Sequence, residues 1–212
     1  WMPTSDGLIA HDPASGDWTV FQDESHGQES LSHFLGGIAA VPGGEVLWLV
    51  DASGRLCRFD PSTQTCLLTT APSGPVFGVS QIQVGPQGWV ALGTLANGSY
   101  LYDGETWQQL VTADPVMGNT FHSVVYAPDG HLWLAGETIL QHFPAARPSE
   151  EPLVFTLPEE GAPRVLHAAR DGLWIGHTAG ATFLPYLDTM NRLDLPLGGP
   201  GEAIAEEVTA IT

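Results

Sequence analysis

Histidine and cysteine are the side chains of this 212-residue sequence best suited to chemistry, and their spacing limits what they can do. The eight histidines stand at spacings that match no zinc signature, so neither a metal ion nor another cofactor is expected. These residues are His11, His26, His33, His122, His131, His142, His167 and His177. Their role therefore depends on the elements that carry them.

The two cysteines, Cys57 and Cys66, flank a segment whose Asp-Pro pair is typical of a hairpin turn. If the turn is centred on Pro61 and Ser62, the cysteines face each other directly across two strands, within reach of a disulfide bond. Two interpretations stay open, an extracytoplasmic staple and a pair of buried thiols. The first favours a periplasmic or secreted location.

The strongly negative net charge of the chain limits the kinds of molecule that it can bind. The chain has 24 acidic residues, six arginines and no lysine, which gives a formal net charge of −18. Such a surface repels phosphate backbones and anionic lipids, so binding of nucleic acid is not expected. Membrane insertion is not expected either, because no apolar run approaches the roughly 18 residues of a spanning helix. Neutral carbohydrates and peptides remain compatible with this charge, as does a role in solubility alone.

An internal repeat organises the chain. A tryptophan followed by small or apolar residues recurs in "WMPTSDGLIAHD", "LWLVDASGRLCRFD", "LWLAGETILQHF" and "LWIGHTAGATFL". A further unit, "GPQGWVALGTLANGSYLYD", places Ala91 where the others have tryptophan. The anchors, at intervals of about 42 residues, are Trp1, Trp48, Ala91, Trp133 and Trp174.

Each unit holds four short strands, best seen in residues 121–127, 132–137, 139–143 and 152–157. Four-stranded units at this period predict an all-β fold, a five-bladed β-propeller that forms one domain over residues 1–212. The recurrent tryptophan is expected to pack between blades. Because the chain begins on the second strand of a blade, we expect the C-terminal strand, residues 208–212, to close the ring. The alternative is that the segment belongs to a longer array of blades.

The motifs "DGHLWLAGETI" and "DGLWIGHTAGATF" resemble the two-component regulator propeller repeat, and the resemblance covers nearly the whole chain. It implies a sensory or ligand-recognition module that works beside other domains of a parent protein. The family pattern names no catalytic residues to carry over, and its propellers usually have more than five blades.

Ligands of propellers bind at one mouth of the central channel, where first strands and the loops that precede them converge. Those segments supply the candidate ligand-binding residues, which are Glu29, His33, Phe34, Phe77, Asn119, Phe121, His122, Arg164 and His167. Their mixture of polar and apolar groups suits a neutral carbohydrate or a short peptide. A purely structural, protein-interaction scaffold is the rival hypothesis.

Enzymatic function is the least favoured hypothesis. Glycoside hydrolysis needs two convergent carboxylates, and the expected first strands contain no aspartate or glutamate. The sequence also lacks a Gly-x-Ser-x-Gly elbow and a phosphate-binding loop. We therefore expect a non-enzymatic module, with a glycoside hydrolase-like propeller as the remaining alternative.

Overall fold

The computed structural model describes residues 1–4, 7–21, 37–41, 43–51, 55–70, 78–110, 120–144, 152–156 and 162–186. These residues form five antiparallel sheets, each made of strands that follow one another along the chain. The first sheet contains β1 (Met2–Thr4), β2 (Gly7–His11) and β3 (Trp18–Phe21). The second contains β4 (Gly37–Ala40), β5 (Leu47–Val50), β6 (Arg55–Asp60) and β7 (Thr65–Thr70).

The third sheet contains β8 (Val79–Val84), β9 (Val90–Thr94), β10 (Ser99–Tyr102) and β11 (Trp107–Leu110). The fourth contains β12 (Phe121–Tyr126), β13 (Leu132–Gly136), β14 (Ile139–Phe143) and β15 (Leu153–Thr156). The fifth contains β16 (Pro163–Ala168), β17 (Gly172–His177) and β18 (Gly180–Pro185).

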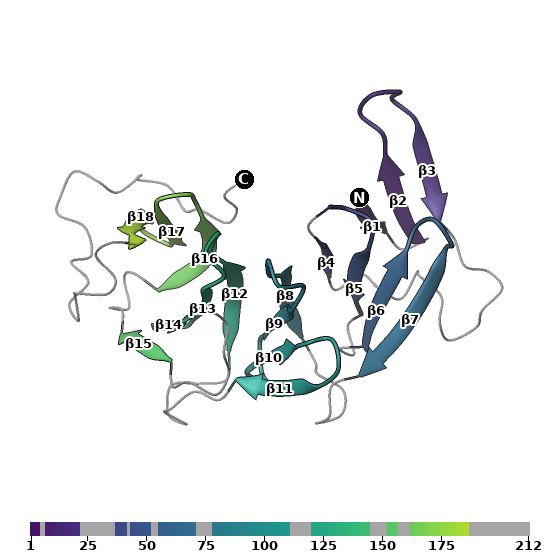
Figure 1. The fold of residues 1–212 in the computed structure, drawn as a ribbon. Helices are drawn as coiled ribbons and strands as arrows, with labels where there is room; N and C mark the ends of the chain where they lie inside the picture. Colours follow the sequence, from purple (N-terminus) through teal and green to yellow (C-terminus); the bar gives the residue numbers. More distant parts are fainter. Residues whose placement is uncertain are drawn as a thin grey trace.

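The sheets are the blades of a β-propeller, as the repeat predicts (Figure 1). Their first strands form the inner layer, in which β4 lies against β8, β8 against β12, and β12 against β16. No helix in the described part of the chain is long and apolar enough to cross a membrane. The first sheet begins at its second strand. The C-terminal strand expected to complete it, residues 208–212, lies outside the described residues, so closure of the ring stays a prediction.

Aspartates close the hairpins between the third and fourth strands of three blades. Asp12, Asp60 and Asp103 each accept a hydrogen bond from the backbone N–H two residues further on, at 2.8 to 2.9 Å. Hydrogen bonds within each turn lower the pKa of all three carboxyls, because they favour the charged form. The strongest effect comes from the N–H of Ala14 on Asp12, the hydroxyl of Ser62 on Asp60 and the N–H of Thr106 on Asp103. The Asp-Pro and Asp-Gly signals in the sequence thus correspond to Asx turns.

The repeated tryptophans pack between blades where both neighbours are described. Trp48 lies in a buried cluster with residues of the third blade such as Leu92 and Tyr100. Trp133, which is 1% exposed, lies in a cluster with Leu173 and other residues of the fifth blade. The predicted packing role is therefore confirmed at these two positions.

The hairpin that carries the cysteines has a different register from the expected one. Its last pair is Asp60 with Thr65, so the loop contains four residues, not two, and Cys66 faces Phe59. The direct-facing arrangement of Cys57 and Cys66 is wrong. The loop is longer because Asp60 also bonds the N–H of Thr63, and Gln64 turns the chain with φ of 56°.

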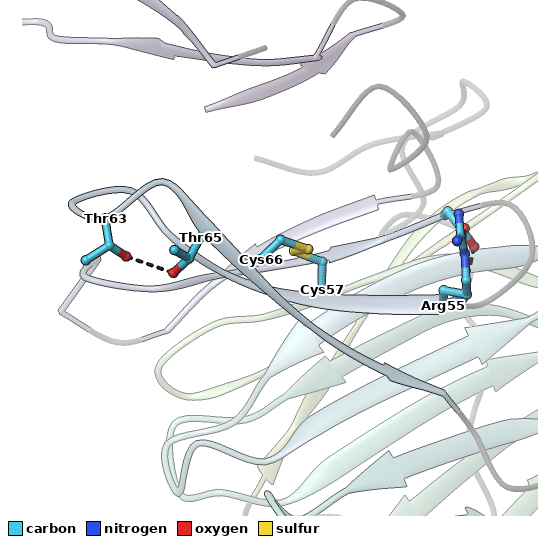
Figure 2. The surroundings of a disulfide bond; sticks show 6 residues. Arg55, Cys57, Thr63, Thr65 and Cys66 are labelled. Atoms are coloured by element: carbon cyan, nitrogen blue, oxygen red, sulfur yellow. Dashed lines mark hydrogen bonds and ion pairs between the residues drawn. A yellow bond between two sulfur atoms is a disulfide. The ribbon is translucent and has the colours of Figure 1, made fainter. Parts of the chain in front are cut away.

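A disulfide nevertheless joins Cys57 and Cys66, which are diagonal neighbours on one face of β6 and β7 (Figure 2). Their Cα atoms are 5.4 Å apart, within the normal range for disulfides. Cys57 is fully buried in the cluster that holds Leu8, Leu49 and Phe59. The bond therefore ties the outer strand of the second blade to its core.

Candidate functional site

Three successive inner strands carry a β-bulge at the same place. The register shifts between Val79 and Gln81 in β8, between Phe121 and Ser123 in β12, and between Pro163 and Val165 in β16. The extra residues stand 42 positions apart, and we call them the bulge row: Ser80, His122 and Arg164. A bulge changes the direction of one side chain at the end of a strand, and bulges are over-represented beside functional sites.

The bulge row brings residues of neighbouring blades into contact. Arg164 Nη1 lies 3.2 Å from His122 Nε2, and the Ser80 hydroxyl donates to the carbonyl of Phe121. Gly93 leaves room for this arrangement, since a Cβ there would lie 3.0 Å from Ser80 Oγ. The row therefore runs across three blades, at the end where each inner strand begins.

A hydrogen-bond chain directly below the bulge row links the same strands. Gln81 Oε1 accepts from Ser123 Oγ at 2.7 Å and from the N–H of Val124 at 2.9 Å. Ser123 Oγ in turn accepts from the N–H of Leu166 at 3.0 Å. Ser123 is 1% exposed. Buried polar groups that are fully paired hold a structure rigid, so this chain fixes the spacing of the bulge row.

Electrostatics at the bulge row favour a neutral imidazole. Burial, and next the positive charge of Arg164, lower the pKa of His122, whereas the exposed Glu137 acts in the opposite direction. A guanidinium can only donate hydrogen bonds. His122 Nε2 must therefore be the acceptor, which places the imidazole proton on Nδ1.

The structure places the candidates from the sequence unevenly. It brings His122 and Arg164 together. Phe121 is a correction, because its ring is fully buried in the core and is not open to a ligand. His167 is partly buried and lies nearer the other end of β16. The remaining candidates lie outside the described residues: Glu29, His33, Phe34, Phe77 and Asn119.

Sequence reasoning missed two polar members of this site, Ser80 and Glu137. A usable signal existed for the first. Ser80, His122 and Arg164 each stand ten or eleven residues before a repeat anchor, Ala91, Trp133 or Trp174. Glu137, in the turn after β13, carries no comparable signal. Its charge acts on His122 because the fold brings the turn near the start of β12, and the sequence pattern does not show this.

A second histidine pair lies in the fourth blade. His131 Nδ1 is 2.8 Å from His142 Nε2, and the ring of His142 stacks on Trp133 with centroids 4.2 Å apart. Burial first, and then the charge of His131, lower the pKa of His142 to about 4. Within the described ranges, no three histidine, cysteine, aspartate or glutamate side chains gather as metal ligands do. We interpret this pair as part of the core.

Comparison with known proteins supports the fold and leaves the activity open. No family model and no curated protein matches the chain. Among solved structures, the chain is similar to a catalytically inactive virginiamycin B lyase from Staphylococcus aureus with quinupristin, at 12% identity and a TM-score of 0.60. That match covers 71% of this chain and 52% of the lyase.

Two other solved structures are similar over more of the chain. The GH74 enzyme of Niastella koreensis matches at 14% identity and a TM-score of 0.65, over 88% of this chain and 33% of the enzyme. YCF48 bound to D1 peptide matches at 13% identity and a TM-score of 0.62, over 90% of this chain and 60% of YCF48. The chain thus spans between a third and three fifths of the length of these propellers. They include enzymes and a peptide-bound protein, so the shared property is the β-propeller.

Proposed function

We propose that this chain is a non-enzymatic recognition module that binds a short peptide at the bulge row. One observation carries the proposal: three neighbouring inner strands bulge at equivalent positions and present Ser80, His122 and Arg164 side by side. This gives a hydroxyl, a neutral imidazole and an exposed guanidinium within one short row. These groups can bind backbone carbonyls and a carboxylate of a peptide.

Support for recognition rather than catalysis comes from the inner strands. The four described inner strands, β4, β8, β12 and β16, carry no aspartate or glutamate, so no carboxylate pair lies on them. Of the similar structures, YCF48 is bound to a peptide. A neutral carbohydrate is the other ligand class that such a row can bind, since its hydroxyl groups both donate and accept.

The wider setting is part of the same proposal. We propose that the blades are related to two-component regulator propeller repeats and act as the sensor part of a longer protein. The disulfide between Cys57 and Cys66 supports an oxidising compartment, either periplasmic or extracellular. The rival role, a scaffold that only holds other domains, needs no open bulge row.

Peptide and glycan arrays test the proposal. The wild-type chain is compared with Arg164→Ala and with Arg170→Ala, an exposed arginine in the turn at the other end of the same blade. We expect the wild type and Arg170→Ala to select the same peptides. Arg164→Ala should lose about tenfold or more in affinity, as expected for the loss of a charge-assisted hydrogen bond. Selection of glycans alone, or of nothing, contradicts peptide recognition.

A further inference from the structure

A groove between the second and third blades lies outside the bulge row. Its volume is about 570 Å³, within the range of sites that hold small molecules. We call it the inter-blade groove, and the residues that line it are Val41, Val46, Trp48, Arg58, Leu67, Leu68, Thr69, Gly88, Tyr102 and Gly104. Most of these are apolar or aromatic, and a single one is charged.

One wall of the inter-blade groove is a row of side chains across the second blade. Trp48 pairs with Arg58, and Arg58 pairs with Leu67, on three adjacent strands. Trp48 is nearly buried, Arg58 is exposed, and Leu67 is 68% exposed. A large apolar side chain with this exposure beside a cavity is available for contact with a ligand.

Tyr102 of the third blade lines the opposite wall, together with Gly88 and Gly104. Tyr102 meets Trp48 edge-on, with ring centroids 5.6 Å apart, and it also lies 5.0 Å from Trp107. The indole N–H of Trp107 donates to Thr69 Oγ1 across the two blades at 3.4 Å. The hydroxyl of Tyr102 donates to the carbonyl of Gly104. The ring of Tyr102 is therefore held in place where it lines the groove.

The corresponding positions in other blades show what is special about Arg58. The residue opposite the tryptophan anchor is His142 in the fourth blade and Phe183 in the fifth, and Leu101 stands opposite Ala91 in the third. His142 and Leu101 are buried, and Phe183 packs on Trp174. Of these four equivalent positions, the second blade alone places a charged group there, beside an open cavity.

Arg58 is not neutralised within the described part of the chain, where it makes no hydrogen bond or ion pair. The turn carboxylates at this end of the two blades, Asp60 and Asp103, are engaged by N–H and hydroxyl groups of their own turns. In a protein of net charge −18, a guanidinium that no described side chain pairs with is a local site of positive charge in the lining of this groove. Its natural partner is a carboxylate.

We propose that the inter-blade groove is a second binding site, for a small carboxylic acid with a flat apolar body. The apolar body lies against Tyr102 and Leu67, and the carboxylate pairs with Arg58. The volume of the groove and the single cation fit one such molecule. This site is independent of the bulge row and does not depend on peptide recognition there.

Calorimetric titration with indole-3-acetate and with its uncharged analogue, indole-3-acetamide, tests this proposal. We expect the wild type to bind the acid at least tenfold more tightly than the amide. Arg58→Gln should bind the two equally, whereas Arg170→Gln should keep the preference. Leu67→Ala changes an exposed side chain without disturbing the core, and it should weaken both ligands a few-fold.

Three results would overturn the proposal. One is equal binding of acid and amide by the wild type. Another is an unchanged preference in Arg58→Gln. The third is that a peptide with a C-terminal tryptophan binds whereas free indole-3-acetate does not. The groove would then bind the C-terminus of a peptide chain and not a small acid.

Discussion

The guanidinium of Arg164 lies 3.2 Å from Nε2 of His122, a residue of the neighbouring blade 42 positions earlier in the chain. Both residues occupy the bulge of their inner strand, so the contact follows from the repeat itself. It joins two polar side chains at the same end of two neighbouring inner strands. It also makes the protonation of His122 a reporter of the site's geometry.

The first prediction concerns this reporter. Because Arg164 lowers the pKa of His122, Arg164→Gln should raise it, and because Glu137 acts oppositely, Glu137→Gln should lower it. NMR titration of the imidazole measures both shifts. Shifts in the same direction for the two variants, or none for Arg164→Gln, would contradict the described contact.

The second prediction concerns stability in acid. The pKa of His142 is about 4 in the folded chain and about 6.5 when unfolded, so the unfolded chain binds the extra proton first. Above pH 6.5, His142 is neutral in both the folded and the unfolded chain and does not reduce stability. As the pH falls from 6.5 toward 4, protonation of the unfolded chain lowers the free energy of unfolding. His142→Phe, which copies Phe183 of the fifth blade, should remove on the order of 2 kcal/mol of this acid-induced loss.

Chemical denaturation of the wild type and His142→Phe between pH 7 and 4 provides the measurement. The loss should decrease without vanishing, because burial also lowers the pKa of His122 and His177. Identical loss of stability in the two proteins would show that His142 is not the buried neutral imidazole of the structure.

The third prediction concerns the hydrogen-bond chain below the bulge row. Gln81→Ala removes the acceptor of Ser123 and of the Val124 N–H, so it should destabilise the protein by about 1–3 kcal/mol. Gln83→Ala, on the same strand and with no such bond in the described structure, is the control and should cost less than about 1 kcal/mol. Equal losses in the two variants would argue against a special role for Gln81.

The fourth prediction concerns the disulfide. The intact protein should be two hydrogens lighter in mass before reduction than after it. Opening a loop with a sequence separation of 9 should cost on the order of 2–3 kcal/mol of stability, because the unfolded chain gains freedom. Denaturation of the oxidised protein and of Cys66→Ser tests this. Two free thiols in protein purified without reductant would contradict the bond.

The blades follow from the sequence more directly than the site does. The anchors Trp48 and Trp133 recur at a fixed period, and their large side chains can be buried only between packed sheets. Element type and order therefore follow from local pattern. The strands of the fourth blade begin and end within a residue of the expected positions.

The bulges could not be predicted in the same way. A residue such as His122 is extra only relative to its pairing with β13, and nothing in its own type specifies this. The hairpin of Cys66 shows the same limit. Its Asp-Pro pair indicates a turn equally well for a loop of two residues, as expected, and for the loop of four residues in the structure, but the two loops give different registers. Phe121 was wrongly expected to face a ligand because its place at the start of a first strand does not show which way its side chain points, and in the structure the ring lies in the core.

The central claim, that the bulge row binds a peptide, is tested most directly by the dissociation constant of the tightest peptide from the array. It should be measured by calorimetry for the wild type, for the double variant His122→Ala with Arg164→Ala, and for Arg170→Ala. We expect the double variant to bind at least tenfold more weakly, with Arg170→Ala unchanged. Equal affinity of all three proteins would contradict the claim and place the peptide elsewhere on the propeller.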